Sequence, residues 1–183
     1  MWISTAVIIM VGVALLLVSR RSLRRPHTHG FYRLFVFQSI LALLWLNLPL
    51  WTVNPESPLQ RLSGVCLGLS LYLLLHSLYL LLRRGGHSKR RRDAANFRFE
   101  NTARLVDSGL YRYIRHPMYG SLLFLLWGCY LKGPGLAASV LVVLGSWALV
   151  RAARTEEGEN IRTFGQAYRD YIARTRMFIP YLF

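Results

Sequence analysis

The sequence alternates long apolar runs with short basic segments. Uncharged runs cover residues 2–18, 34–53 and 62–82, and shorter apolar runs cover 118–131 and 136–150, on either side of a Gly-Pro turn. A helix that spans a bilayer needs about 20 predominantly apolar residues. The first three runs therefore predict membrane crossings. The last two predict a thin helical hairpin whose ends borrow residues from the membrane interface.

Two further segments complete the chain. Residues 83–116 mix basic and apolar side chains, which is typical of chain that lies at a membrane surface. From residue 151 onward, apolar side chains recur at helical spacing at Ile161, Phe164, Tyr168, Tyr171 and Ile172. We expect an amphipathic helix folded back along the inner membrane face, followed by an apolar tail. The predicted fold is a single all-α integral membrane domain with five transmembrane helices, an interfacial segment (83–116) and this cytosolic C-terminal helix (151–183).

The charge distribution separates two classes of protein. The net charge of +15, in a chain that is 54% hydrophobic, fits either a nucleic-acid binder or a membrane protein whose cations face one side. With five crossings and the N-terminus outside, only Arg61 and Lys132 lie outside, and 21 of the 23 Lys and Arg residues lie inside. This pattern favours a multi-pass protein with a cytosolic C-terminus, of the bacterial inner-membrane type, and excludes a nucleic-acid partner.

The most informative stretch is Arg112–Gly120, where the basic segment meets an apolar run. Pro117 suits the first turn of a helix and pushes His116 towards an extended conformation. His116 and Tyr119 would then lie beside the N-terminus of a helix that enters the membrane. A helix N-terminus favours negative charge, so this stretch predicts a site for an anionic or zwitterionic ligand.

Acidic residues cluster on the same predicted side. Glu156, Glu157 and Glu159 follow the last crossing, in a chain with only eight Asp and Glu residues. One interpretation is that they stabilise a helix N-terminus. The other is that one of them binds the ammonium group of a ligand whose carboxylate meets Arg115 or His116.

Other reactive side chains favour structural roles. His27 and His29 have no Cys or acid near them in sequence, so a metal site is not predicted. His76 and the two cysteines, Cys66 and Cys129, lie in apolar runs and are interpreted as packing or helix-to-helix contacts. The chain has no phosphate-binding loop, no dinucleotide fingerprint and no serine nucleophile elbow, which excludes soluble nucleotide-binding folds.

Two motifs give a more specific indication. Leu105–Tyr119 resembles the S-G-x-Y-x-x-x-R-H-P-x-Y signature of the isoprenylcysteine carboxyl methyltransferase family and its bacterial, phospholipid-methyltransferase-like relatives. Glu156-Glu157, followed by Phe164-Gly165-x-x-Tyr168-x-x-Tyr171, resembles the C-terminal E-E…F-G-x-x-Y-x-x-Y element of the same family. The two motifs occur in the order that the family has and are separated by the predicted hairpin.

The resemblance implies an integral membrane methyltransferase that binds S-adenosylmethionine at the cytosolic face without a Rossmann fold. Such a transfer is an in-line displacement that needs alignment and desolvation more than proton transfer. By position, the resemblance implies the following cofactor-binding residues: Asn96, Arg104, Leu105, Val106, Tyr111, His116, Pro117, Met118, Tyr119, Glu156 and Glu157.

One position departs from the family pattern. Members that act on prenylated cysteine have an Arg four residues before the first Glu of the pair, where this chain has Ala152. Arg151 and Arg154 flank that position, so the candidate catalytic set is Arg115, His116, Arg151 and Arg154. The expected acceptor is a lipophilic small molecule or lipidated substrate that enters from the bilayer and offers a carboxylate, thiol or amine. A phospholipid amine methyltransferase and a non-catalytic membrane scaffold are the alternatives.

Overall fold

The computed structural model describes residues 2–86 and 102–181, and this part of the chain is helical, as predicted. An isolated parallel bridge joins Ile114 and Arg176. The elements, in chain order, are α1 (Trp2–Val18), α2 (Arg20–Leu23), α3 (His29–Asn47), the 3-10 turn η1 (Leu48–Leu50), α4 (Pro58–Arg84), the 3-10 turn η3 (Gly109–Arg112), α5 (Pro117–Leu131), α6 (Leu136–Phe164) and α7 (Gln166–Arg174).

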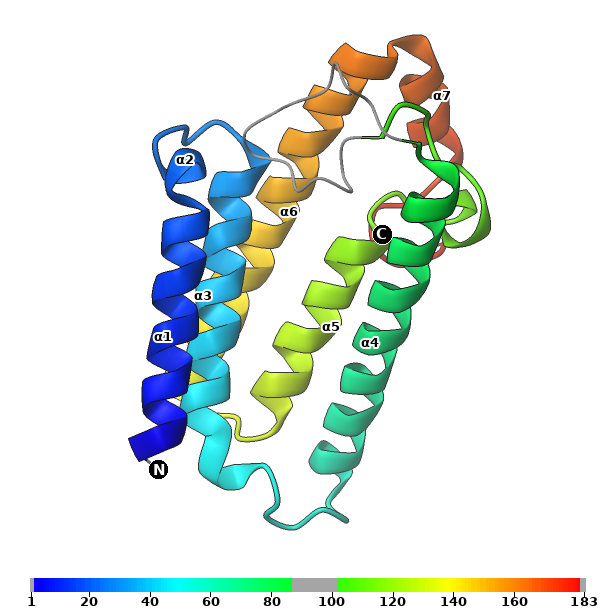
Figure 1. Ribbon diagram of the computed structural model, residues 1–183. Helices are drawn as coiled ribbons and strands as arrows, with labels where there is room; N and C mark the ends of the chain where they lie inside the picture. Colours follow the sequence, from blue (N-terminus) through cyan, green and yellow to red (C-terminus); the bar gives the residue numbers. More distant parts are fainter. Residues whose placement is uncertain (1, 87–101, 182–183) are drawn as a thin grey trace.

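Three helical segments are long and apolar enough to cross a membrane, namely His29–Leu50, Pro58–Arg84 and Leu136–Phe164. Thr5–Val18 and Pro117–Leu131 are apolar but shorter. The chain is therefore described as an all-helical membrane protein, and the count of five crossings stays a prediction. The apolar helices α1, α3, α4, α5 and α6 form one bundle in which successive helices run in opposite directions (Figure 1). The helix α2, the end of α4, the start of α5 and α7 lie at the same end of this bundle.

The helix that begins at Leu136 does not end at Val150 as predicted. It continues to Phe164, and the break falls at Gly165, whose φ of +60° is in the left-handed region that favours glycine. The predicted C-terminal amphipathic helix is thus wrong in its bounds, because its first half is the end of α6 and its second half is α7. The charged residues after Val150 did not stop the helix, and its C-terminal end projects beyond the ends of α3 and α5 (Figure 1).

This continuous helix also changes the setting of the acidic cluster. Glu156, Glu157 and Glu159 lie within α6, well after its first turn. The interpretation that they stabilise a helix N-terminus is therefore wrong. Their side chains are instead available to neighbouring elements.

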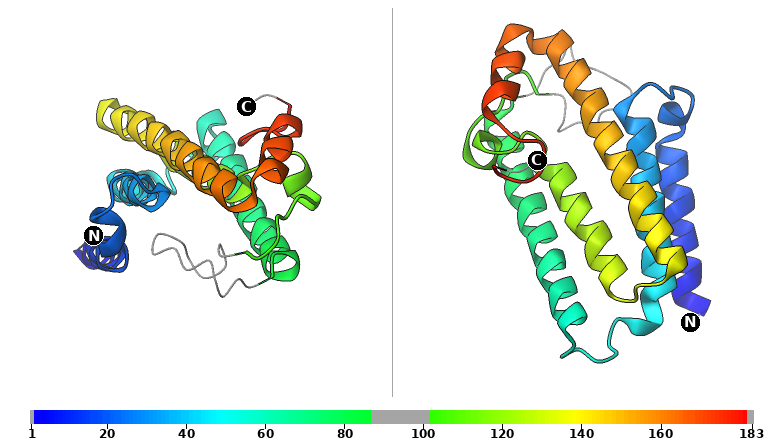
Figure 2. Two further views of the ribbon diagram at one scale, coloured as in Figure 1. Left: turned by 90° about the horizontal axis from the view of Figure 1, so that it is seen from above. Right: turned by 180° about the vertical axis from the view of Figure 1, so that it is seen from behind.

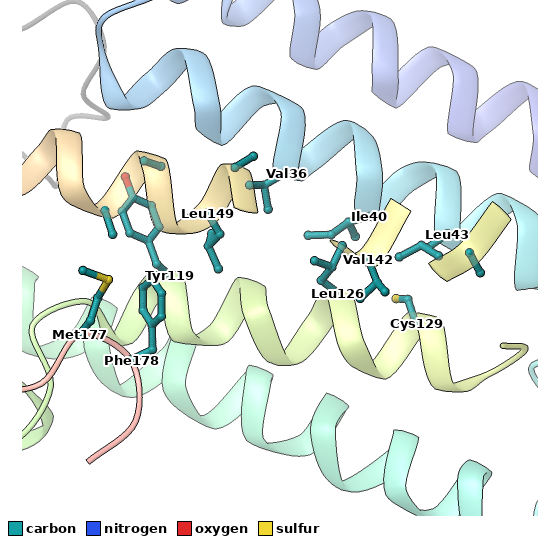
Figure 3. Close-up of a cluster of buried hydrophobic side chains, with 14 residues drawn as sticks. Val36, Ile40, Leu43, Tyr119, Leu126, Cys129, Val142, Leu149, Met177 and Phe178 are labelled. Atoms are coloured by element: carbon teal, nitrogen blue, oxygen red, sulfur yellow. The ribbon is translucent and has the colours of Figure 1, made fainter. Parts of the chain in front are cut away.

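The core lies where α3, α5 and α6 meet, and α5 lies between α4 and α6 (Figure 2). Val36, Leu43, Leu126 and Leu149 are completely buried there (Figure 3). Gly145 allows α6 to approach α5 closely, because a Cβ at this position would lie 2.9 Å from Cδ2 of Leu126. Small residues commonly let membrane helices approach in this way.

The C-terminal tail returns to the start of α5. The backbone N–H of Arg115 donates to the carbonyl of Arg176 (2.7 Å), and that of His116 donates to the carbonyl of Met177 (3.1 Å). Met177 and Phe178 are buried beside Tyr119 (Figure 3). The tail therefore fixes the residues that precede α5, where the sequence predicted a site.

Candidate functional site

The segment before α5 is shaped by Gly109, the first residue of η3. Its φ is +64°, and a Cβ at this position would lie only 2.7 Å from Cδ1 of Leu80 in α4. Both facts require glycine. The turn buries Tyr111 against Leu80 and Val106, which together form a small apolar cluster. The Ser-Gly-x-Tyr part of the first motif thus anchors this loop on α4.

The start of α5 is as predicted, with Pro117 as its first residue and His116 as its N-cap. His116 is 5% exposed and its ring stacks on that of Tyr119, with centroids 5.5 Å apart and planes at 19°. The ring of Phe178 meets His116 edge-on. The imidazole is therefore held in one orientation between the helix start and the tail.

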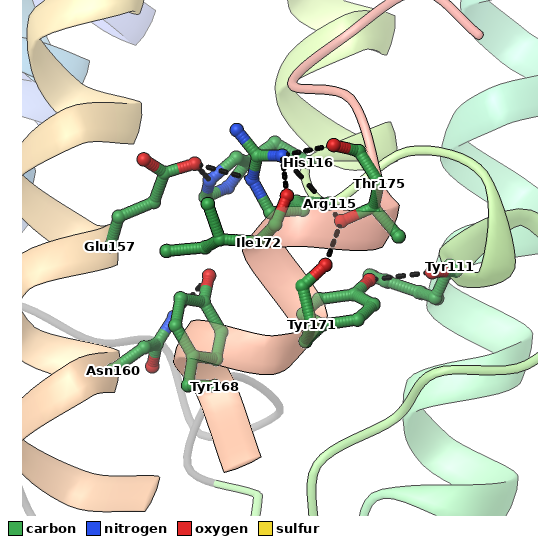
Figure 4. Close-up of polar contacts among 9 residues, drawn as sticks. All are labelled: Tyr111, Arg115, His116, Glu157, Asn160, Tyr168, Tyr171, Ile172 and Thr175. Atoms are coloured by element: carbon green, nitrogen blue, oxygen red, sulfur yellow. Dashed lines mark hydrogen bonds and ion pairs between the residues drawn. The ribbon is translucent and has the colours of Figure 1, made fainter. Parts of the chain in front are cut away.

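Arg115 pairs with Glu157, the second residue of the acidic pair (Figure 4). Its Nε donates to Oε1 of Glu157 at 2.6 Å, and the two side chains are only 9% and 14% exposed. Nη1 of Arg115 donates to the carbonyls of Thr175 (2.5 Å) and Ile172 (3.3 Å). Because its donors are engaged in this way, Arg115 ties the start of α5 to α6 and to the tail.

The same carboxylate oxygen of Glu157 lies 3.3 Å from Nε2 of His116. Glu157 therefore holds both members of the Arg-His pair, and the charge of Arg115 is neutralised within the protein. The sequence placed the acidic cluster on the same side as Arg115 and His116 but predicted that a ligand would lie between them, whereas Glu157 contacts both directly. Arg115 and Glu157 are 42 positions apart in the sequence.

Glu156 occupies a different position from Glu157. Its carboxylate has His116, His29 and Arg33 as electrostatic neighbours. It lines a hollow next to the start of α5. Glu156 is thus the carboxylate of the acidic pair that a ligand in the hollow would meet.

The hollow has a cavity volume of about 90 Å³ and opens to solvent. Its walls come from the loop before α5, the start of α5, α6 and α7. The predicted cofactor-binding residues that line it are Leu105, Val106, Tyr111, His116, Pro117, Met118, Tyr119 and Glu156, and the predicted catalytic residue Arg115 lines it too.

Other predicted residues are not among those that line the hollow. Arg104 and Glu157 are absent from its walls, and Asn96 falls outside the described residues. Arg151 and Arg154 are exposed, and the guanidinium of Arg151 lies 5.5 Å from the ring centre of Tyr32 on α3. Neither arginine therefore lies in the hollow, where it could take the role of the Arg that prenylcysteine methyltransferases have at the position of Ala152. Ala152 itself is fully buried.

The walls also contain residues that the predicted site lacked: Leu81, Thr102, Asn160, Phe164, Tyr168 and Tyr171. Asn160 donates to the hydroxyl of Tyr168 (3.3 Å), and the hydroxyl of Tyr171 donates to the carbonyl of Tyr111 (2.6 Å; Figure 4). Burial raises the pKa of both Tyr168 and Tyr171, so both stay neutral. The second motif contained a signal for Phe164 and the two tyrosines, whereas Asn160 had none.

The hollow thus combines one carboxylate, one imidazole and several aromatic rings. A carboxylate can bind an ammonium group, and aromatic faces favour cations and flat rings. In the described part of the chain, no three His, Cys, Asp or Glu side chains are grouped so as to hold a metal ion. The arrangement suits an organic ligand that carries both an amino group and an aromatic ring.

Comparison with known families gives one match. Residues 18–175 match the model of a family described as "Protein of unknown function (DUF1295)". The match covers most of the chain, and the protein belongs to this family. No match was found among the curated proteins.

Proposed function

We propose that this DUF1295 protein is an S-adenosylmethionine-dependent methyltransferase similar to the isoprenylcysteine carboxyl methyltransferase family. The observation that carries the proposal is the hollow beside α5. Both motif segments line it, Leu105–Tyr119 from one side and Glu156–Tyr171 from the other. A pocket in which motifs far apart in sequence meet is the first candidate for a binding site.

The side chains of the hollow fit the chemistry of this cofactor, which would supply an electrophilic methyl group on a sulfonium. Glu156 is suited to its ammonium group and His116 to its carboxylate. Tyr111, Phe164 and Tyr168 offer aromatic faces for the adenine and the sulfonium. The apolar residues among its walls would help a bound ligand to displace water, and methyl transfer requires a desolvated, aligned pair of groups.

Arg115 and Glu157 have a supporting role in this proposal. Their ion pair, together with the hydrogen bonds from Arg115 to the tail, holds the backbone on which His116 is presented. We assign them as positioning residues, because Glu157 satisfies Arg115 within the protein. The proposed cofactor contacts are therefore the residues that line the hollow other than Arg115.

We further propose that the protein crosses the membrane five times, with its N-terminus outside and the hollow on the cytosolic side of a bacterial inner membrane. The support is a set of basic residues in the described part of the chain that belong to α2, the end of α4, residues 102–116, and the ends of α6 and α7. These segments meet at one end of the bundle (Figure 1), and basic residues favour the cytosolic face. A lipophilic acceptor would reach the hollow from the bilayer.

The proposal is tested by binding of S-adenosylmethionine with a labelled methyl group to the protein purified in detergent. Wild type is expected to bind, and His116→Ala and Glu156→Gln are each expected to abolish binding. His27→Ala and Glu56→Gln are matched controls, because both side chains are exposed and lie away from the hollow. Binding that is the same in all five proteins would contradict the site.

A wild-type protein that binds the cofactor but transfers no methyl group to a total lipid extract would favour the scaffold interpretation. A protein that does not bind it at all would refute the proposal. Transfer of label to an extracted lipid, lost in His116→Ala, is the expected result.

A further inference from the structure

A second polar cluster lies behind Glu156, between α3 and α6. His29, the first residue of α3, is 1% exposed, and its Nδ1 lies 2.6 Å from Oε2 of Glu159. The backbone N–H of His29 also points to Glu159, with 3.5 Å to Oε1. The carboxylate therefore orients the imidazole and places the ring hydrogen on Nδ1.

The opposite nitrogen of this ring, Nε2, is buried and has no hydrogen-bond partner among the described residues. A buried polar atom without a partner costs stability and calls for an explanation. Orientation of one ring nitrogen by a carboxylate, with the other nitrogen free, is the arrangement by which histidine serves as a general base.

The charges around His29 connect it to the hollow. Glu159 and Glu156 of α6 and Arg33 of α3 are its charged neighbours. Glu156 also interacts with His116 and lines the hollow. Glu156 is thus an electrostatic neighbour of two imidazoles, that of His116 at the start of α5 and that of His29 at the start of α3.

We propose that His29, oriented by Glu159, is the general base that takes a proton from the methyl acceptor. This inference rests on the proposed function. It also narrows the substrate class to acceptors that carry a hydrogen on the nucleophilic atom, such as an amine or a thiol. An ionised carboxylate needs no base, and Ala152 leaves this part of α6 without an inward-facing cation to bind one.

The proposed step balances in atoms and electrons. The lone pair of the acceptor nitrogen or sulfur forms a bond to the methyl carbon, and the bond from that carbon to the sulfonium breaks, with its electron pair going to sulfur. The proton of the acceptor passes to Nε2 of His29. The resulting imidazolium is stabilised by the carboxylate of Glu159.

The test uses the full chain in detergent, with S-adenosylmethionine that carries a tritiated methyl group and a total membrane lipid extract as the source of acceptor. Wild type, His29→Gln, Glu159→Gln and the exposed control His27→Gln are compared for cofactor binding and for single-turnover transfer across a range of pH. Labelled products are then treated with alkali, because methyl esters release volatile methanol whereas N-methyl and S-methyl groups do not.

We expect His29→Gln to bind the cofactor as wild type does, which also shows that it is folded, and to transfer the methyl group at least about 100-fold more slowly. Glu159→Gln should retain part of the rate, with its pH profile displaced to lower pH because the imidazole loses its carboxylate. His27→Gln should match wild type, and the label should withstand alkali.

The outcomes separate the two proposals. If His29→Gln transfers the methyl group as fast as wild type, or if alkali releases the label as methanol, the role of His29 as a base is refuted. The proposed methyltransferase activity would not be affected by either result. If His29→Gln does not fold, an unchanged rate and pH profile in Glu159→Gln would overturn it instead. Absence of cofactor binding in wild type would refute the proposed function itself.

Discussion

Replacement of Glu157 by Gln should reveal how much the buried ion pair with Arg115 stabilises the protein. The chain offers a matched comparison, because Asp107 and Arg174 form a second pair with the same shortest distance of 2.6 Å. The side chains of the first pair are 9% and 14% exposed, and those of the second are 60% and 48% exposed. The pairs differ in burial, and with it in the further contacts of the first pair to His116 and to the carbonyls of Ile172 and Thr175.

Removal of one member of a buried pair leaves the other charge uncompensated and costs about 3–5 kcal/mol, whereas exposed pairs contribute about 0.2–1 kcal/mol. The amide of Gln keeps one neutral hydrogen bond to Arg115, so Glu157→Gln should cost about 3 kcal/mol. The matched change Asp107→Asn should cost less than about 1 kcal/mol. For a chain of this length, 1 kcal/mol corresponds to roughly 2–4 °C in Tm.

The assay is thermal unfolding in detergent, followed by tryptophan fluorescence. Glu157→Gln is expected to lower Tm by about 6–12 °C and Asp107→Asn by less than about 4 °C. Added salt should reduce the second effect further, because exposed charges are screened. Equal shifts in the two variants would refute the reasoning that burial decides the contribution of these pairs.

Three further predictions concern packing, a buried hydroxyl and topology. Gly145→Ala should destabilise the protein by about 1–3 kcal/mol, since its Cβ would lie 2.9 Å from a leucine of α5. Gly68→Ala, with open space around it, should stabilise α4 by up to about 1 kcal/mol, and the same sign for both in thermal unfolding would contradict this packing. Tyr171→Phe should cost about 1 kcal/mol, because its hydroxyl donates to a buried carbonyl. Burial raises the pKa of Tyr171, so the unfolded chain loses this proton at lower pH than the folded protein, and the free energy of unfolding should fall above about pH 10. This alkaline loss of stability should be smaller in Tyr171→Phe. An equal loss in wild type and Tyr171→Phe would contradict the prediction. With both native cysteines replaced by serine, a cysteine at Glu56 should react with a membrane-impermeant maleimide in intact cells and one at Arg25 only after lysis, whereas the reverse would overturn the proposed topology.

The sequence predicted local features well. The apolar runs correspond to helices, and Pro117 begins α5 because a proline without N–H fits a first helical turn. The membrane side of each basic segment was also inferred from the pattern of runs, and it stays a prediction. These features depend on residues close together in the chain, so composition and periodicity are sufficient to predict them.

Features that depend on distant contacts were predicted less well. The end of α6 was missed, because a change from apolar to polar residues marks the limit of a membrane crossing and not the end of a helix. The break at Gly165 was missed as well, where a glycine with positive φ separates α6 from α7.

The contact between His29 and Glu159 joins residues 130 positions apart. Nothing in the local sequence of His29 indicated an acidic partner, and its pairing depends on how α3 packs against α6. The sequence also contained no signal that Glu156 lines the hollow while Glu157 pairs with Arg115, because these different contacts depend on how α6 is oriented in the bundle.

The most direct test of the central claim is to locate bound S-adenosylmethionine by ultraviolet cross-linking of the labelled cofactor, followed by peptide mapping. The account predicts adducts in the segments 102–119 and 156–171, which line the hollow. Excess S-adenosylhomocysteine should prevent them, and they should be absent in His116→Ala. Adducts confined to other segments, or none that unlabelled cofactor displaces, would contradict the assignment of this hollow as a cofactor site.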